Sequence, residues 1–327
     1  MAGDTSEAGR VEWFAERFEA LVGNVTSFIR GKDDVVRKAV LCLCSEGHLL
    51  IEDVPGVGKT SLARALSSSF EGSMRRIQFT PDLLPSDVLG VQVYDTARGE
   101  FTFHPGAVFA NIVIGDEINR ASPKTQSALL ECMEERQVTV DGVPYAVPRP
   151  FIVLATLNPL GDGGTYALPQ AQVDRFQMRV TMGYPGHEAE RDVLISRASG
   201  ETPEHLQPVL SAADLVQMIE IASRVVYAAP AVVDYVVTLV SATRTMSELV
   251  LGVSPRGAVG LLMVARAQAA SQGRAFVTAQ DVKAAAPAVL AHRMVLQPDA
   301  ELQGHTADEL VRTLLASIPV PQQRVEA

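Results

Sequence analysis

Apolar residues recur at helical spacing in the first part of the chain and in short continuous runs further on. From Val11 to Cys44 they fall three and four positions apart, and Gly31 divides this stretch into two predicted helices. Beyond it, short apolar runs alternate with helical stretches. Such runs are typical of parallel strands that are buried on both faces. The pattern therefore predicts an α/β fold, with a parallel sheet flanked by helices.

The predicted sheet has five strands and is interrupted by two hairpins. Residues 91–103 alternate apolar and polar around a turn at 95–99, and residues 136–150 do so around Asp141-Gly142, which is a typical hairpin turn. Ser122 followed by Pro123 is a typical helix start. We expect strands at 48–52, 76–79, 111–115, 151–156 and 178–182, and helices at 59–70 and 122–135.

After Pro185-Gly186 the strand pattern stops, and the rest of the chain predicts a small all-helical domain. We expect a disordered tail at 1–10, an α/β domain at 11–185, an all-helical domain at 186–303, and a C-terminal helix and tail at 304–327. The helices of the second domain are expected at 188–199, 212–223, 231–246, 254–271 and 279–289.

Composition narrows the classes of function. The chain has 327 residues, of which 47% are hydrophobic and 20% charged, which is typical of a globular protein of about two domains. Its 28 basic and 38 acidic residues give a net charge of −10. Such a charge argues against general binding of nucleic acid or anionic membranes, which requires a basic face. The apolar stretch 225–240 contains Asp234 and is too short for a membrane span.

The cysteines and the N-terminus predict a cytoplasmic protein. There are three cysteines, an odd and low number that favours a reducing compartment, and the first seven residues are polar and acidic, unlike a signal peptide. Cys42 and Cys44 form a CxC pair without a second pair of ligands at metal-binding spacing elsewhere. We therefore interpret them as apolar residues of a helix.

A glycine-rich loop between a predicted strand and a predicted helix carries the first chemical signal. In such a loop, glycines let backbone N–H groups approach phosphates, the lysine reaches the β- and γ-phosphates, and the following hydroxyl binds Mg²⁺. Asp53 stands where the general pattern GxxxxGK(S/T) has its first glycine. The residues expected to bind nucleotide are Pro55, Gly56, Val57, Gly58, Lys59, Thr60 and Ser61.

Two adjacent carboxylates, Asp116 and Glu117, follow a buried strand. In open α/β sheets, ligands bind beyond the carboxyl ends of the strands. We expect Asp116, together with Thr60, to hold Mg²⁺ and Glu117 to orient and deprotonate the attacking water. Asn158 ends the next buried strand along the chain and could contact the γ-phosphate or that water.

Two arginines complete the set of candidates. Arg175 precedes the last predicted strand, and Arg256 lies in the first turn of a predicted helix. A cation in that turn is disfavoured by roughly 0.3–1 kcal/mol, and a bound phosphate would compensate for it.

These motifs, in this order, resemble those of the AAA+ ATPases: Walker A, Walker B, sensor 1, arginine finger and sensor 2. The segments EDVPGVGKT, FHPGAVFANIVIGDEINRASPKTQSALLECMEERQVTVDG, GTYALPQAQVDRF and SPRGA are similar to those of the MoxR family. The resemblance extends from about Leu21 to Val289. Gln170 stands where the family has Glu, and Asp53 departs from the general Walker A pattern.

The resemblance implies a P-loop core with inserted hairpins, a small helical lid, and an ATP-hydrolysing ring, expected to be a hexamer. ATP and Mg²⁺ would lie between subunits, with Arg256 acting from the lid of the same subunit and Arg175 inserted into the neighbour's site. The implied activity is chaperone-like remodelling of other proteins, with a partner that contains a von Willebrand factor A domain.

Alternative functions share the same motifs. A motor subunit of a metal-chelatase complex would differ in the partner that it binds. A nucleotide-gated adaptor would bind ATP with little hydrolysis, against which Glu117 and Asn158 argue. A DNA-acting ATPase is disfavoured by the negative net charge. The sequence does not indicate the client protein or the pathway.

Overall fold

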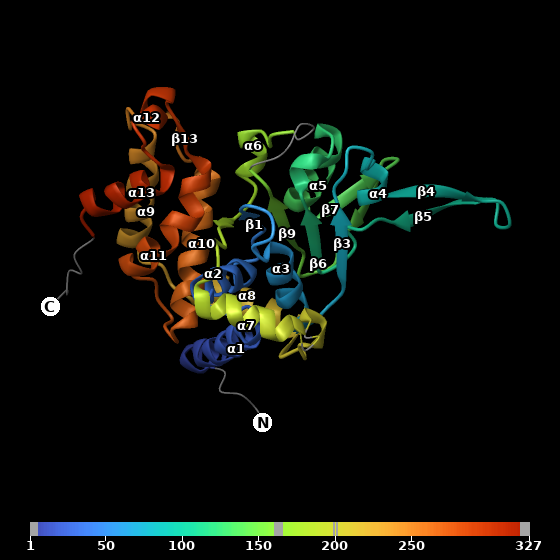
Figure 1. The fold of residues 1–327 in the computed structure, drawn as a ribbon, viewed down its shortest axis with the longest axis horizontal. Helices are drawn as coiled ribbons and strands as arrows, with labels where there is room; N and C mark the ends of the chain where they lie inside the picture. Colours follow the sequence, from blue (N-terminus) through green and yellow to red (C-terminus); the bar gives the residue numbers. More distant parts are fainter. Residues whose placement is uncertain (1–5, 160–165, 199, 201, 321–327) are drawn as a thin grey trace. The chain divides into compact units, whose positions relative to one another are not determined.

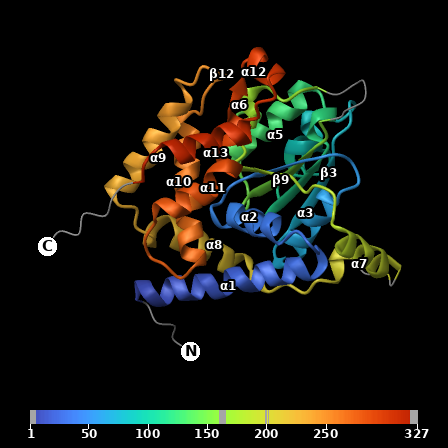
Figure 2. The same cartoon turned by 60° about the vertical axis from the view of Figure 1, so that its left-hand side comes forward.

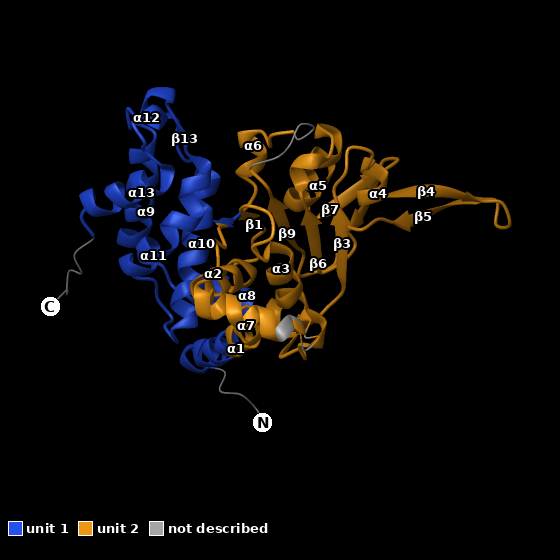
Figure 3. Ribbon diagram, in the orientation of Figure 1, with its two compact units in different colours: residues 1–19, 177–179, 217–327 blue, residues 20–176, 180–216 orange. Residues whose placement is uncertain are grey.

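The computed structural model describes residues 6–159, 166–198, 200 and 202–320. The chain forms two compact units, shown in Figure 3. Unit 1 comprises residues 1–19, 177–179 and 217–327, and unit 2 comprises residues 20–176 and 180–216. This division differs from the predicted boundary after residue 185, because residues 186–216 belong to the unit that contains most of the sheet.

A five-stranded sheet organises the fold, with the strand order β10-β1-β9-β6-β3. The pairs β1–β9, β9–β6 and β6–β3 are parallel, and all five residues of β6 are buried. The continuous apolar runs are therefore central strands, as predicted. The strands are β1 (Leu49–Glu52), β3 (Met74–Gln78), β6 (Ile112–Asp116), β9 (Ile152–Leu157) and β10 (Met178–Val180).

The predicted helices of the first two hundred residues are present, with small shifts at their ends, whereas the short helices at Pro85–Leu89 and Gln170–Val173 were not predicted. The first helix begins at Glu7, so residues 7–10, expected in a tail, are helical, whereas residues 1–5 and 321–327 lie outside the described chain. Ser122 caps its helix by accepting the backbone N–H of Thr125, as its sequence indicates. The helices are α1 (Glu7–Phe28), α2 (Asp33–Cys44), α3 (Lys59–Ser68), α4 (Pro85–Leu89), α5 (Pro123–Glu135), α6 (Gln170–Val173) and α7 (His187–Ala198).

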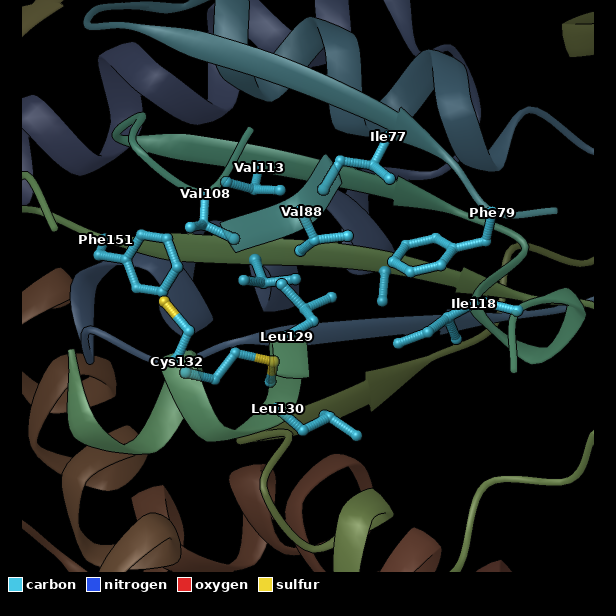
Figure 4. Packing of buried hydrophobic residues seen from close by; sticks show 14 of the residues in the cluster. Ile77, Phe79, Val88, Val108, Val113, Ile118, Leu129, Leu130, Cys132 and Phe151 are labelled. Atoms are coloured by element: carbon cyan, nitrogen blue, oxygen red, sulfur yellow. The ribbon is translucent and has the colours of Figure 1, made fainter. Parts of the chain in front are cut away.

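One face of the sheet is covered by α5, and the core of unit 2 lies between them (Figure 4). Leu129 and Cys132 of α5 pack beside Val113 of β6 and Phe151, which precedes β9. All four side chains are at most 1% exposed. Burying such side chains stabilises the fold by roughly 1.5–3 kcal/mol each, so this core fixes the strands that lead into the site.

Both predicted hairpins are present, and an aromatic pair joins them. β4 (Gly90–Asp95) pairs with β5 (Glu100–Pro105), and β7 (Gln137–Val140) pairs with β8 (Val143–Ala146). Figure 1 shows β4 and β5 extending away from the sheet. The ring of Phe103 in β5 stacks on that of Tyr145 in β8, with centroids 3.9 Å apart. The two insertions are therefore packed together.

Unit 1 is helical, with two small strands that the sequence did not predict. β12 (Leu249–Leu251) pairs antiparallel with β13 (Val295–Leu296). In Figures 1 and 2, α10 and α11 lie side by side, and several alanines of α10 are buried. From residue 212 onward the helices are α8 (Ala212–Glu220), whose first five residues belong to unit 2 and which continues into a π-turn (Ile221–Val225), then α9 (Pro230–Thr243), α10 (Pro255–Ser271), α11 (Ala279–Leu290), α12 (Pro298–Leu302) and α13 (Ala307–Ser317).

The remaining elements are short. β2 (Phe70–Glu71) and β11 (Leu210–Ser211) form a two-residue parallel pair, and three 3₁₀ turns cover 118–120, 203–205 and 291–293. Within the described ranges, none of the helices is both long enough and apolar enough to cross a bilayer.

Candidate functional site

The glycine-rich loop connects β1 to α3, as predicted. Gly56 and Gly58 have φ values of 86° and 96°, a left-handed region that favours glycine. Gly58 is also the N-cap of α3. The loop therefore curls around the first turn of a ten-residue helix, where unpaired backbone N–H groups and the helix dipole favour an anion.

Asp53 has a structural role at the position where the general pattern has glycine. Its Oδ1 accepts the backbone N–H of Val54 at 2.7 Å, and its Oδ2 accepts that of Gly183 at 2.6 Å. Asp53 is not among the residues with positive φ. A glycine is therefore not required here, and the carboxylate links the start of the loop to the segment that contains Gly183.

Lys59, the first residue of α3, folds back over the loop. Its Nζ donates to the backbone carbonyl of Asp53 and, at 3.0 Å, to that of Val54. Burial lowers the pKa of Lys59, although the nearby carboxylates of Asp53, Glu117, Asp116 and Glu52 favour the charged form. The ammonium group is therefore held inside an acidic part of the molecule.

Asp116 ends β6 and is 3% exposed. Its Oδ1 accepts the hydroxyl of Thr60 at 2.9 Å and that of Thr156 at 3.4 Å. Its Oδ2 accepts Nε of Arg76 at 2.6 Å. The structure thus brings together Thr60 and Asp116, the predicted Mg²⁺ ligands.

This pair of oxygen donors fits Mg²⁺, which in nucleotide sites takes one or two protein oxygens, with phosphates and water as its other ligands. Among the described residues there is no group of three or more His, Cys, Asp or Glu side chains that could hold a metal ion by themselves. Thr60 and Asp116 would therefore suit a metal ion that also binds phosphate.

Glu117 has the left-handed backbone conformation, with φ 55°, directly after the strand. Its N–H donates to the hydroxyl of Thr156 at 2.9 Å. Its Oε2 accepts Nη1 of Arg120 at 3.0 Å and Nε2 of Gln78 at 3.4 Å. Non-glycine residues rarely adopt this backbone conformation, and those that do are often found at functional sites.

Lys59, Thr60, Asp116 and Glu117 line one cavity of about 500 Å³, a size typical of small-molecule sites. Asn158, which follows β9 as predicted, lies in the same wall. Sequence analysis missed Arg76, Gln78 and Thr156 there. The lining comprises Phe28, Ile29, Arg30, Lys32, residues 55–61, Arg76, Gln78, Asp116, Glu117, Thr156, Asn158, Met182, Pro185 and Val193.

The two predicted arginines lie elsewhere in the chain. Arg175 follows α6 in unit 2, does not line the cavity, and forms an ion pair with Glu134 of α5, with Nη2 and Oε2 3.2 Å apart. Arg256 belongs to unit 1 and lies in the first turn of α10, which Ser254 caps by accepting the N–H of Gly257 at 3.3 Å. Unit 2 alone therefore does not bring the full predicted set together.

The cysteines are free and buried, as expected for apolar helix residues. Burial raises the pKa of the Cys132 thiol to about 12 and raises that of Cys44 further above its usual value. Because the thiolate is the reactive and metal-binding form, neither residue is suited to catalysis or to metal binding.

Comparison with known proteins agrees with this geometry. The profile of the "ATPase family associated with various cellular activities (AAA)" matches residues 48–178, and that of the "AAA lid domain" matches residues 241–314. A solved structure of a proposed ATPase from Cytophaga hutchinsonii superposes with a TM-score of 0.88 at 34% identity, covering 96% of this chain and 97% of that one.

The sequence similarity to several relatives extends over nearly the whole chain. YeaC of Bacillus subtilis is 44% identical, covering 95% of this chain and 98% of its own. The chaperone MoxR1 of Mycobacterium tuberculosis is 40% identical, covering 93% and 82%. The protein MoxR of Methylorubrum extorquens is 31% identical, covering 94% and 95%. With its parallel sheet, glycine-rich loop and helical lid, this chain belongs to the MoxR family of AAA+ ATPases.

Proposed function

We propose that the protein binds ATP with Mg²⁺ in the cavity of unit 2 and hydrolyses it to ADP and phosphate. The observation that carries this proposal is that Lys59, the pair Thr60–Asp116 and Glu117 line one cavity. Phosphoryl transfer requires positioning and charge stabilisation, and these are what a helix N-terminus, an ammonium group and a metal-binding carboxylate provide.

Each residue has a distinct part in this proposal. The N–H groups of the loop and Lys59 bind the phosphates, while Thr60 and Asp116 hold Mg²⁺, which neutralises phosphate charge when bound. Glu117 takes the proton of the attacking water, and Asn158 helps to orient that water. Phe28, Ile29 and Met182, which also line the cavity, offer apolar contacts to the base.

Two further parts of the proposal concern assembly. We expect subunits to form a ring, with Arg175 completing the site of a neighbour, since unit 2 holds Arg175 outside its own cavity. Arg256 would act from the lid of the same subunit. The ring, expected to be a hexamer, would remodel client proteins together with a partner that contains a von Willebrand factor A domain.

Replacement of Glu117 by Gln tests the hydrolytic step. Glu117→Gln should keep the affinity for ATP and lower turnover by about 10²–10⁴-fold, the usual contribution of a general base. Phosphate release and binding of a fluorescent ATP are the measurements. Glu131→Gln, an exposed carboxylate on α5, is the matched control. Unchanged turnover in Glu117→Gln would exclude this residue as the base.

Mixing of variants tests the assembly. Arg175→Ala should lower turnover by about 10³–10⁵-fold while ATP still binds. Adding subunits that carry Lys59→Met, which have an intact Arg175 but a defective phosphate site, should restore part of the activity. Arg98→Ala, on the exposed turn of the first hairpin, is the control. If the mixture stays as inactive as its components, Arg175 does not act between subunits.

A further inference from the structure

Arg76 occupies a place in the cavity that the proposed function does not account for. It lies near the end of β3, next to β6, and paired residues of the two strands include Arg76 with Ile114 and Gln78 with Asp116. Its side chain is 43% exposed, yet its Nε is 2.6 Å from Oδ2 of the buried Asp116. A flexible, solvent-accessible cation therefore contacts the carboxylate that is expected to face Mg²⁺.

Both oxygens of Asp116 have donors from this chain. Oδ1 accepts the hydroxyls of Thr60 and Thr156, which are neutral, and Oδ2 accepts the guanidinium of Arg76. A buried carboxylate is costly without a compensating charge. A metal ion bound to this carboxylate would supply such a charge itself and would therefore compete with the Arg76 guanidinium.

We propose that Arg76 is the counter-charge of Asp116 in the nucleotide-free protein and that it competes with Mg²⁺ for this carboxylate. The inference rests on the proposed nucleotide site. It makes Arg76 a positioning residue that sets the Mg²⁺ concentration at which nucleotide binds.

The neighbouring residue offers a matched control. Arg75 is on the same strand, is exposed, and is not among the residues that line the cavity. Successive side chains of a strand point to opposite faces. Arg75→Gln therefore removes the same charge from the same strand without changing the donor to Asp116.

The experiment measures binding of fluorescent ADP as a function of free Mg²⁺, so that hydrolysis does not contribute. Arg76→Gln should lower the half-saturating Mg²⁺ concentration about tenfold, which corresponds to about 1.4 kcal/mol. The half-saturating Mg²⁺ concentration of Arg76→Lys should lie between those of Arg76→Gln and the wild type, because a lysine keeps the charge without the planar Nε–H donor. Arg75→Gln should match the wild type.

A second readout does not require nucleotide. Titration of the nucleotide-free protein with Mn²⁺, followed by electron paramagnetic resonance, should show tighter binding in Arg76→Gln than in the wild type. If the wild type binds no nucleotide, the proposed function fails, and the Mn²⁺ titration alone decides the inference about Arg76. Thermal unfolding verifies that each variant is folded, and Arg76→Lys serves for both readouts if Arg76→Gln does not fold.

Two results would overturn the inference. An unchanged dependence on Mg²⁺ and Mn²⁺ in both Arg76 variants would mean that the guanidinium does not compete with the metal. A higher Mg²⁺ requirement in Arg76→Gln would mean that Arg76 assists metal or phosphate binding.

Discussion

The two ends of the central sheet carry similar residue types in opposite roles. At the amino end, which we define by Glu46 and His48 before β1, the polar side chains bind other groups of the protein. At the carboxyl end, defined by the loop after β1 and by Asp116, Glu117 and Asn158, the polar side chains face a cavity.

His48 illustrates the structural end. Its Nδ1 accepts the N–H of Val153 at 3.0 Å, and its Nε2 donates to the carbonyl of Met133 at 3.1 Å, so the imidazole is neutral. Burial lowers its pKa to about 4, and Arg136 acts in the same direction. A histidine in such surroundings links a strand to α5 and is not available as a catalytic base.

Glu46 shows the same behaviour in a carboxylate. Arg136 and Arg149 lie 2.5 and 3.1 Å from its Oε1. Burial alone would raise the pKa of Glu46, but these two guanidinium groups outweigh it and hold the pKa below its usual value. Glu117 also accepts an arginine, yet it borders the cavity and is half-buried. Position at the sheet, more than residue type, therefore separates structural from functional groups.

The largest expected effect tests the carboxyl end. Lys59→Met should weaken ATP binding by roughly 100-fold, because a charged hydrogen-bond donor to phosphate contributes up to about 3 kcal/mol. The free energy of unfolding should not decrease, since burial already disfavours the charge of Lys59. Calorimetric titration and urea denaturation measure the two quantities, with Lys124→Met, an exposed lysine of α5, as control. A large loss of stability in Lys59→Met without loss of ATP binding would mean that Lys59 is a structural residue, like those at the amino end of the sheet.

A smaller effect is expected at the amino end, and it depends on pH. His48 has a lower pKa when folded than the usual 6.5, so the unfolded chain binds more protons between pH 6.5 and 4. Its contribution to stability is therefore complete above pH 6.5 and decreases as the pH falls. Between pH 7 and pH 5 the loss should be about 2 kcal/mol.

The variant His48→Gln isolates this contribution. Glutamine keeps a donor and an acceptor but does not titrate, so its urea-denaturation free energy should change less between the two pH values than that of the wild type. ATP turnover at pH 7 should remain within about twofold of the wild type per folded molecule. Equal pH dependence in both proteins would show that His48 is not the group responsible.

The smallest effect would refine the comparison, because Asp53 is a structural residue at the functional end. Asp53→Ala removes the contacts to Val54 and Gly183. It should lower the free energy of unfolding by about 1–2 kcal/mol, measured by urea denaturation against Asp82→Ala, an exposed carboxylate of the same unit. An equal effect in the two variants would mean that the link to Gly183 does not contribute to stability.

Sequence reasoning located those parts of the site that strand topology determines. A buried apolar run followed by Asp116 and Glu117 places both carboxylates at the carboxyl edge, and β9, which is adjacent to β6, places Asn158 beside them. Arg76 and Gln78 could have been found from their alternation on β3, which places two polar side chains on the same face of the sheet, next to β6. Thr156 could not be identified from the sequence, because threonine is common in strands that have no functional role.

Other features depend on contacts that a local pattern does not contain. The pairs β12–β13 and β2–β11 involve only two or three residues in each strand, separated by more than forty positions, so no periodicity indicates them. The ion pair of Arg175 with Glu134 likewise joins α5 to a segment forty residues later. The roles of Arg175 and Arg256 in catalysis stay predictions.

The stack of Phe103 on Tyr145 has a mechanical consequence. The stack joins the two ends of a chain segment that begins in the first hairpin, continues through β6 and α5, and ends in the second hairpin. Asp116 and Glu117 lie within that segment. A partner that pulled on either hairpin would therefore transmit force to the segment that bears both carboxylates. Tyr145→Ala would remove the aromatic stack and so uncouple the two hairpins.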